Sequence, residues 1–156
     1  MGEKNTIVIH SILNNINDIE NKLLNAIERY NKALEACNLE RYPDTFALIQ
    51  NNLGIAYVKL ASIKDAEKNL MKAINAYKEA LKIRTIKTHP LKYFLLQKAI
   101  GDAYYQLSLF KEALDAYQRF LQIEREMGGF LRLHEIYLDV KNKIRMAINQ
   151  KEKSKW

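Results

Sequence analysis

QNNLGIAY (Gln50–Tyr57) returns as QKAIGDAY (Gln97–Tyr104), so the chain repeats an eight-residue pattern at an interval of 47 residues. The match extends beyond these stretches, because ENKLLNAIERYNKALE (Glu20–Glu35) aligns with EKNLMKAINAYKEALK (Glu67–Lys82) at the same interval. Agreement over a whole period indicates an internal structural repeat, which is a stronger signal than any short motif.

Each repeat carries apolar residues at helical spacing. Leu53, Tyr57 and Leu60 follow one another at i, i+4 and i+7, which places them on one face of a helix. Gly54 and its counterpart Gly101 would each destabilise a helix interior by about 1 kcal/mol. Their paired recurrence predicts close helix contacts at both positions rather than helix ends.

Short connections separate the helical patterns, and two of them end in the aligned Pro43 and Pro90, where new helices are expected to begin. Short connections make successive helices antiparallel neighbours. The predicted helices lie near residues 5–37, 44–61, 64–86, 91–107, 110–127 and 130–150, and a break of the first around Asn14–Asn17 is left open.

The stretches NNLGIAY and KAIGDAY, with a following Ala-x-x-x-Tyr-x-x-Ala as in AINAYKEA, resemble the tetratricopeptide repeat. That family carries Leu-Gly-x-x-Tyr on the first helix of each unit and Ala-x-x-x-Phe-x-x-Ala on the second, with a period of about 34 residues. Here Gly54 precedes Ala73 by 19 residues and Gly101 precedes Ala113 by 12. The excess of seven is about two helical turns, so it predicts a longer helix with unchanged phase.

The resemblance implies an all-α fold, a right-handed α-α superhelix of about six antiparallel helices with a capping helix at the C-terminal end. It implies one repeat domain over residues 1–150, followed by a basic tail at 151–156. The domain divides into units at about 16–62, 63–108 and 109–127 and a cap at 130–150. The first unit lacks the Leu-Gly-x-x-Tyr stretch, so one end of the array is expected to be uncapped.

Composition and motifs exclude several classes of protein. No apolar run approaches the ~20 residues of a membrane span, and the first residues lack the pattern of a signal peptide, so a cytoplasmic protein is expected. No phosphate-binding loop, nucleophile motif or metal-ligand spacing occurs, which predicts no enzyme activity and no cofactor. We expect His89 to be solvated in a connection and the single Cys37 to pack against the next helix.

Net charge raises the alternative of nucleic-acid binding. The chain carries +7, but residues 141–156 hold six Lys or Arg against one Glu, which is +5, so the remaining residues 1–140 carry only +2. A basic helix and tail of this kind is an alternative site for phosphate contacts. Nucleic acid is not the favoured partner, because Ile144, Met146 and Ile148 lie among the cations and one arginine alone is present there.

The resemblance favours a protein–protein interaction or scaffold module, whose first helices line a concave groove for an extended peptide or a partner helix. A homo-oligomer is left open, because the uncapped end could be covered by a second copy. The groove positions implied by the family pattern include aliphatic Leu48, Val58, Leu95 and Leu138, together with the candidate binding residues Asn51, Asn52, Ile55, Lys59, Lys98, Asp102, Tyr105, Gln106, Arg132 and Glu135.

Overall fold

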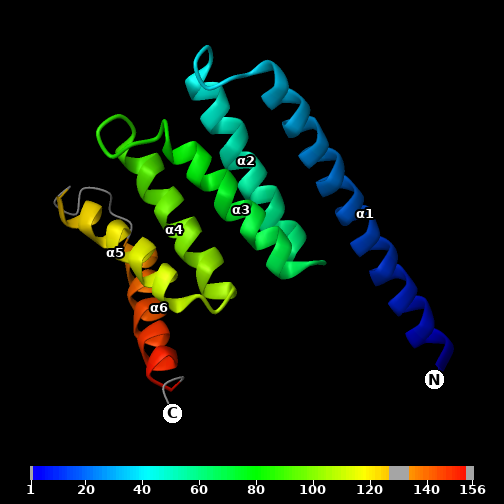
Figure 1. The fold of residues 1–156 in the computed structure, drawn as a ribbon. Helices are drawn as coiled ribbons and strands as arrows, with labels where there is room; N and C mark the ends of the chain where they lie inside the picture. The colour runs from blue at the N-terminus through cyan, green and yellow to red at the C-terminus, as the bar shows by residue number, and fades with distance from the viewer. Residues whose placement is uncertain (1, 127–133, 154–156) are drawn as a thin grey trace.

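The computed structural model describes residues 2–126 and 134–153, and within those ranges it contains six helices and no strand (Figure 1). The expected all-α class is therefore confirmed. The helices are α1 (Gly2–Ala36), α2 (Pro43–Ala61), α3 (Ala66–Leu81), α4 (Pro90–Gln106), α5 (Phe110–Glu126) and α6 (His134–Lys153).

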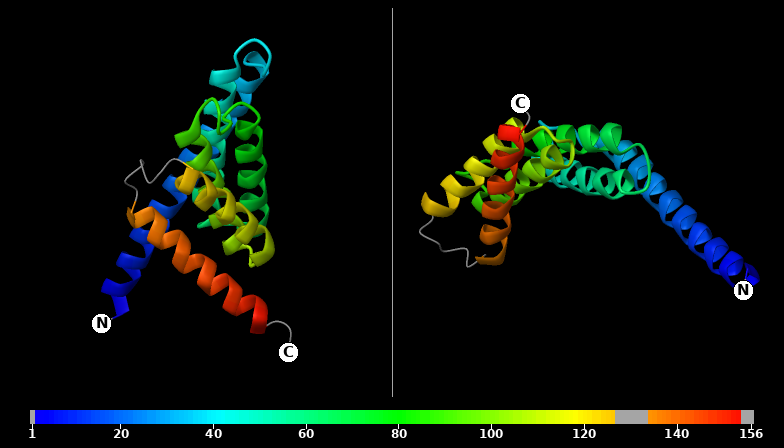
Figure 2. Two further views of the ribbon diagram at one scale, coloured as in Figure 1. Left: turned by 90° about the vertical axis from the view of Figure 1, so that its left-hand side faces the viewer. Right: turned by 90° about the horizontal axis from the view of Figure 1, so that it is seen from below.

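Successive helices are neighbours in space (Figures 1 and 2). The most extensive contacts are those of α2 with α3 and of α4 with α5, which form two helical hairpins. The hairpins meet where α3 packs on α4, while α1 packs on α2 at one end and α6 packs on α5 at the other. In addition, α6 contacts α4, so α4 has three neighbouring helices among the described residues, namely α3, α5 and α6.

The helix starts follow the expected chemistry. Pro43 and Pro90 are the first residues of α2 and α4, where a missing backbone N–H removes no helical hydrogen bond. Each turn within a hairpin contains one residue with a positive φ angle, namely Asp65 (47°), the last residue before α3, and Ser108 (58°), two residues before α5. These left-handed residues reverse the chain within a few positions.

The structure excludes the break in the first helix that the sequence left open, and one expected helix boundary is wrong. Helix α1 is continuous through residues 14–17, because the asparagines there are exposed and can remain hydrated within a helix. Helix α3 ends at Leu81 instead of 86, since the next residues form a hydrogen-bonded turn. In that turn the hydroxyls of Thr85 and Thr88 lie 2.9 Å apart, and Thr88 Oγ1 donates to the carbonyl oxygen of Ile83.

The last helix extends beyond its expected end at residue 150 and reaches Lys153, so the first residues of the basic tail are helical. The predicted start of the cap at residues 130–133 and the predicted last residue of the preceding helix, 127, lie outside the described residues.

The core is a row of apolar clusters, each between successive helices. Ile27 of α1 joins the cluster with α2, the central cluster joins both hairpins, and Val140 of α6 joins the cluster with α4 and α5. In the last cluster the rings of Phe94 and Phe120 stack with centroids 3.8 Å apart.

The two glycines of the repeat make the same contact. A Cβ atom at Gly54 would lie 2.6 Å from Cδ1 of Tyr77, and one at Gly101 would lie 2.6 Å from Cδ1 of Tyr117. Both tyrosines are buried. Each hairpin is therefore closed by a tyrosine ring of its second helix against a glycine of its first, as the paired glycines predict.

The seven extra residues of the first hairpin are divided among three segments. Gly54 is seven residues from the end of α2, whereas Gly101 is five from the end of α4. The turn has four residues (62–65) against three (107–109), and Tyr77 is eleven residues from the start of α3 against seven for Tyr117 in α5. The prediction that a single helix is longer is therefore wrong, because both helices of the first hairpin are extended at the end that meets the turn.

Candidate functional site

A groove lies between α2 and α4 on the face that the repeat pattern assigns to a partner. It holds a pocket of about 150 Å³. We call it the α2–α4 groove, and it is lined by Ala47, Leu48, Asn51, Arg84, Lys92, Leu95 and Leu96. Three of the expected face positions, Leu48, Asn51 and Leu95, are thereby brought together.

The walls of the α2–α4 groove are aliphatic. Leu48 is 54% exposed and Leu95 is 42% exposed, which is high for leucines that face each other across a pocket. Ile55, two turns after Leu48 on α2, is 42% exposed and extends the apolar surface. Neighbouring Asn52 is partly buried and Lys59 is exposed.

Arg84 also lines this groove, although sequence reasoning did not single it out. Its side chain is 7% exposed, its Nη1 bonds a carboxylate oxygen of Asp44 at 2.5 Å, and its Nη2 donates to the Asp44 carbonyl at 3.0 Å. Nε2 of His89 lies 3.5 Å from the same carboxylate and Nδ1 is buried, so the expectation of a solvated His89 is wrong. The cluster ties the start of α2 to the connection before α4.

The other half of the predicted face is occupied by α6. Lys98 and Asp102 of α4 form an ion network with Asp139 and Lys143 of α6, which we call the α4–α6 ion network. The distances are 2.6 Å for Lys98–Asp102, 3.3 Å for Lys98–Asp139, 2.8 Å for Lys143–Asp102 and 2.9 Å for Lys143–Asp139. Lys98 and Asp102 are thus engaged within the fold.

Burial disfavours the charged forms of the side chains in the α4–α6 ion network, but their hydrogen bonds and ion pairs stabilise the charged forms more strongly. The hydrogen bonds and charges of Lys143 and Lys98 hold the pKa of Asp139 below its ordinary value. Those of Asp102 and Asp139 raise the pKa of Lys143. Tyr117 donates its hydroxyl to Asp102 at 2.7 Å, and burial followed by the Asp102 charge raises the pKa of Tyr117.

The remaining predicted residues do not gather in the groove. The Tyr105 ring packs edge-on against Phe110 at a centroid distance of 5.6 Å, which makes it a packing residue between α4 and α5. Gln106 lines a separate shallow pocket with the start of α3. Glu135 is exposed on α6, and Arg132 lies outside the described residues.

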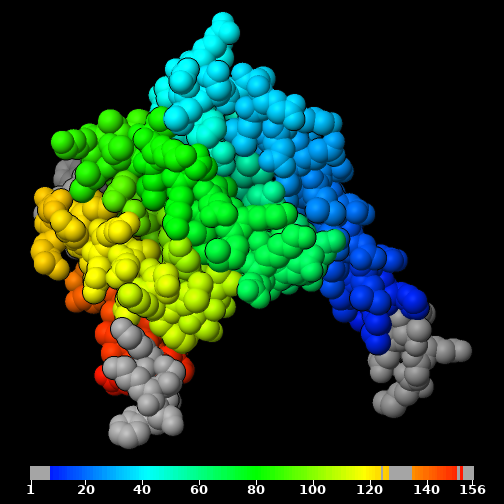
Figure 3. Space-filling view, viewed as in Figure 1, coloured from blue at the N-terminus to red at the C-terminus, as the bar shows by residue number. Residues whose placement is uncertain are grey.

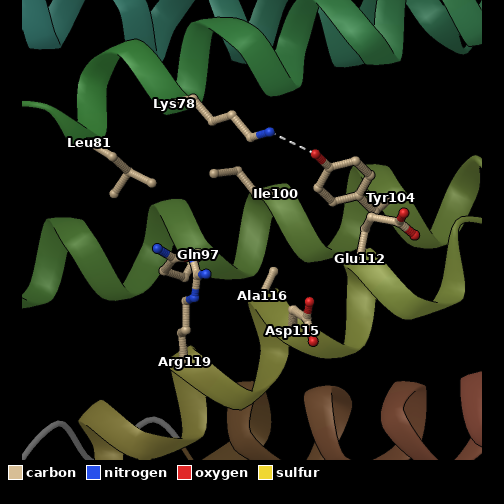
Figure 4. Close-up of a pocket in the computed structure, with 9 residues that line it drawn as sticks. All are labelled: Lys78, Leu81, Gln97, Ile100, Tyr104, Glu112, Asp115, Ala116 and Arg119. Atoms are coloured by element: carbon tan, nitrogen blue, oxygen red, sulfur yellow. Dashed lines mark hydrogen bonds between the residues drawn. The ribbon is translucent and has the colours of Figure 1, made fainter.

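A second pocket, of about 170 Å³, lies between α3, α4 and α5 (Figure 4). Lys78 of α3 donates to the hydroxyl of Tyr104 at 2.8 Å across its upper edge. Glu112, Asp115 and Arg119 of α5 line the opposite side. The pocket is lined by residues from three helices, so no local sequence pattern predicts it.

Cys37 is partly buried against the α1–α2 cluster, as expected. Within the described ranges, no group of three or more His, Cys, Asp or Glu side chains is placed to hold a metal ion. No helix of the described residues combines the length and apolar character that crossing a bilayer requires. Comparison of the chain with family models, curated proteins and solved structures gives no match.

Proposed function

We propose that this chain is a protein-interaction module of the tetratricopeptide type, and that the α2–α4 groove binds a peptide segment or a partner helix. The observation that carries the proposal is the pair of exposed leucines, Leu48 and Leu95, that face a pocket on the predicted binding side. The recurrent contacts of Gly54 with Tyr77 and of Gly101 with Tyr117 support the repeat architecture.

The lining of the α2–α4 groove indicates the kind of ligand. A pocket of about 150 Å³ with aliphatic walls accepts one branched or aromatic side chain as an anchor. The amide of Asn51 can bond a peptide backbone beside that anchor, and the exposed Lys92 favours a neighbouring acidic group. Because α6 occupies Lys98 and Asp102, the bound segment is short and centred on the first halves of α2 and α4.

Selection from a displayed peptide library tests the proposal directly. We expect bound peptides to share an apolar anchor with an adjacent Asp or Glu, and Leu95→Glu to weaken their binding by about tenfold or more, because it places a charge in the apolar pocket. Met71→Glu is the matched control, since Met71 is an equally exposed apolar side chain (41%) on α3 away from the groove.

Both variants should keep the wild-type melting temperature, because neither side chain is buried. Equal affinity of Leu95→Glu and Met71→Glu proteins for the selected peptides would overturn the groove as the binding site.

A further inference from the structure

The first half of α1 has no neighbouring helix among the described residues. Figure 2 shows the helix running past the other helices from its middle to its start, and Figure 3 shows the same segment extending from the body. We call its apolar surface the N-terminal stripe: Val8, Ile9, Ile12, Leu13, Ile16 and Ile19, which are 39–56% exposed. None of the buried core clusters of the described residues includes a side chain from 8–19.

The N-terminal stripe continues an existing interface. Apolar or small residues follow one another at intervals of three and four along the whole of α1, namely Ile9, Ile12, Ile16, Ile19, Leu23, Ala26, Tyr30 and Ala33, and Cys37 after its end. Such a heptad spacing forms a seam for a second helix. From Leu23 onward α2 covers this seam, whereas the seam residues from Ile9 to Ile19 are exposed.

The composition of the stripe points to a second copy of the chain. No Asp, Glu, Lys or Arg occurs from residue 5 to residue 17, so two copies of this surface can face each other without like charges in contact. A two-fold symmetric contact requires a self-complementary surface of this kind. A charged partner would find no Asp, Glu, Lys or Arg side chain to pair with along residues 5–17.

We propose that residues 8–19 of α1 pair with the same segment of a second copy as an antiparallel helix pair. In the register that centres on Asn14, Ile9 of one copy lies against Ile19 of the other and Ile12 against Ile16. This register fills four layers with isoleucine alone. A parallel pair would bring both bodies to the same end, where each seam is already covered by α2, whereas an antiparallel pair places the bodies at opposite ends.

The area of the stripe sets the strength of the dimer. Six half-exposed aliphatic side chains offer roughly 300–500 Å² of apolar surface per copy. Standard interfaces bury about 800 Å² per partner. We therefore expect a reversible dimer with a dissociation constant in the micromolar range.

Sedimentation equilibrium of the full chain from about 1 to 200 µM tests this surface. We expect the mass to rise from 18.2 kDa toward twice that value. The double variant Ile12→Lys/Ile16→Lys should weaken dimerisation by at least about 100-fold, because each ammonium would be buried without a partner. The matched control Ser11→Lys/Asn14→Lys adds the same charge on the opposite side of α1 and should dimerise as the wild type does.

Disulfide trapping in a Cys37→Ala background tests the orientation. Cys at position 9 in one protein and at position 19 in another should cross-link when the two are mixed, because these positions face each other. Each alone should cross-link poorly, since positions 9 and 9 lie about 15 Å apart along an antiparallel pair.

Three outcomes overturn the proposal. A wild-type chain that stays monomeric at 200 µM has no such dimer, and capture of another protein or of lipid vesicles by its stripe would then identify a different occupant. A dimer that survives Ile12→Lys/Ile16→Lys uses another surface. Efficient cross-linking of each single-cysteine protein with itself would demonstrate a parallel pair.

Discussion

Gly54 and Gly101 are held by the tyrosine rings packed against them, and this contact leads to a prediction at each site. Alanine is the better helix former by about 1 kcal/mol, yet its Cβ would overlap the ring of Tyr77 or Tyr117. We expect Gly54→Ala and Gly101→Ala each to lower the free energy of unfolding by about 2 kcal/mol net, because overpacking a core outweighs the propensity gain. Urea unfolding monitored by circular dichroism measures the change.

A second substitution separates the steric cause from others. In a Tyr77→Leu background the ring is absent, so Gly54→Ala should be neutral or stabilising there. If Gly54→Ala stabilised the wild-type protein instead, the close contact with Tyr77 would not be what requires glycine.

Tyr77 makes stability depend on alkaline pH. Burial, with a smaller contribution from the Asp102 charge, raises the pKa of Tyr77 from 10.0 to about 12. The stability that the neutral Tyr77 hydroxyl contributes is fully present below pH 10 and is lost as the pH rises toward 12. In that range this tyrosine ionises more readily in the unfolded chain than in the folded one. We expect Tyr77 to account for a loss of about 1 kcal/mol between pH 10 and 11, and Tyr77→Phe removes this part. Tyr117, whose pKa is also raised by burial and by the Asp102 charge, adds its own loss in both proteins.

Equilibrium unfolding at pH 9, 10 and 11 checks this prediction with the wild-type protein as the reference. Tyr57→Phe is the control, because Tyr57 is only partly buried. An alkaline loss of the same size in the Tyr77→Phe protein would assign the effect to other groups.

At the scale of elements, the α4–α6 ion network holds the last helix on the array. Asp139 is 43% exposed, so solvent limits its value, and we expect Asp139→Asn to cost about 0.5–1 kcal/mol at neutral pH. Because its pKa is lowered in the fold, that contribution is present above its ordinary value of 3.8 and is lost as the pH falls through the folded value.

Hydrogen exchange of the α6 amides measures this effect without unfolding the other helices. The Asp139→Asn protein should exchange faster in α6 at pH 7, and the difference from the wild type should shrink below pH 3.8. A difference that stays constant down to pH 3 would exclude charge pairing as the cause.

Helix existence and order followed from the sequence, while helix ends depended on tertiary contacts. Proline at the start of α2 and of α4 is a local signal, so these starts were predicted to within one residue. The end of α3 was not predicted correctly, because Arg84 lies outside the helix and pairs with Asp44, which is 40 residues earlier in the chain. No short stretch of sequence around Arg84 includes Asp44, so a local pattern cannot reveal this pair.

For the whole molecule, the basic character predicts only weak nucleic-acid binding. Lys143 is engaged with Asp102 and Asp139, and Lys141 lies over the ring of Tyr137 with Nζ 4.7 Å from its centroid. We expect single-stranded DNA to bind with a dissociation constant of about 10⁻⁵ M or weaker and to be released steeply between about 50 and 200 mM salt. Fluorescence anisotropy measures both quantities.

A chain that ends at Gln150 is the control, since it lacks three of the lysines. Binding tighter than about 10⁻⁶ M that persists at 200 mM salt and disappears on this truncation would contradict the prediction and move the functional site to the end of the chain.

The 47-residue repeat by itself determined the helical class, the order of the helices and the presence of a close helix contact at Gly54 and at Gly101, because helical periodicity and steric demand are local and are written twice in the chain. Tertiary structure alone decided which predicted groove residues remain open. Lys98 and Asp102 are polar side chains at surface positions of α4, and nothing in their neighbourhood along the chain distinguishes them from Asn51. They are occupied because α6, about 40 residues later, brings opposite charges to within 2.8–3.3 Å, and charge pairing depends on distance in space rather than along the sequence.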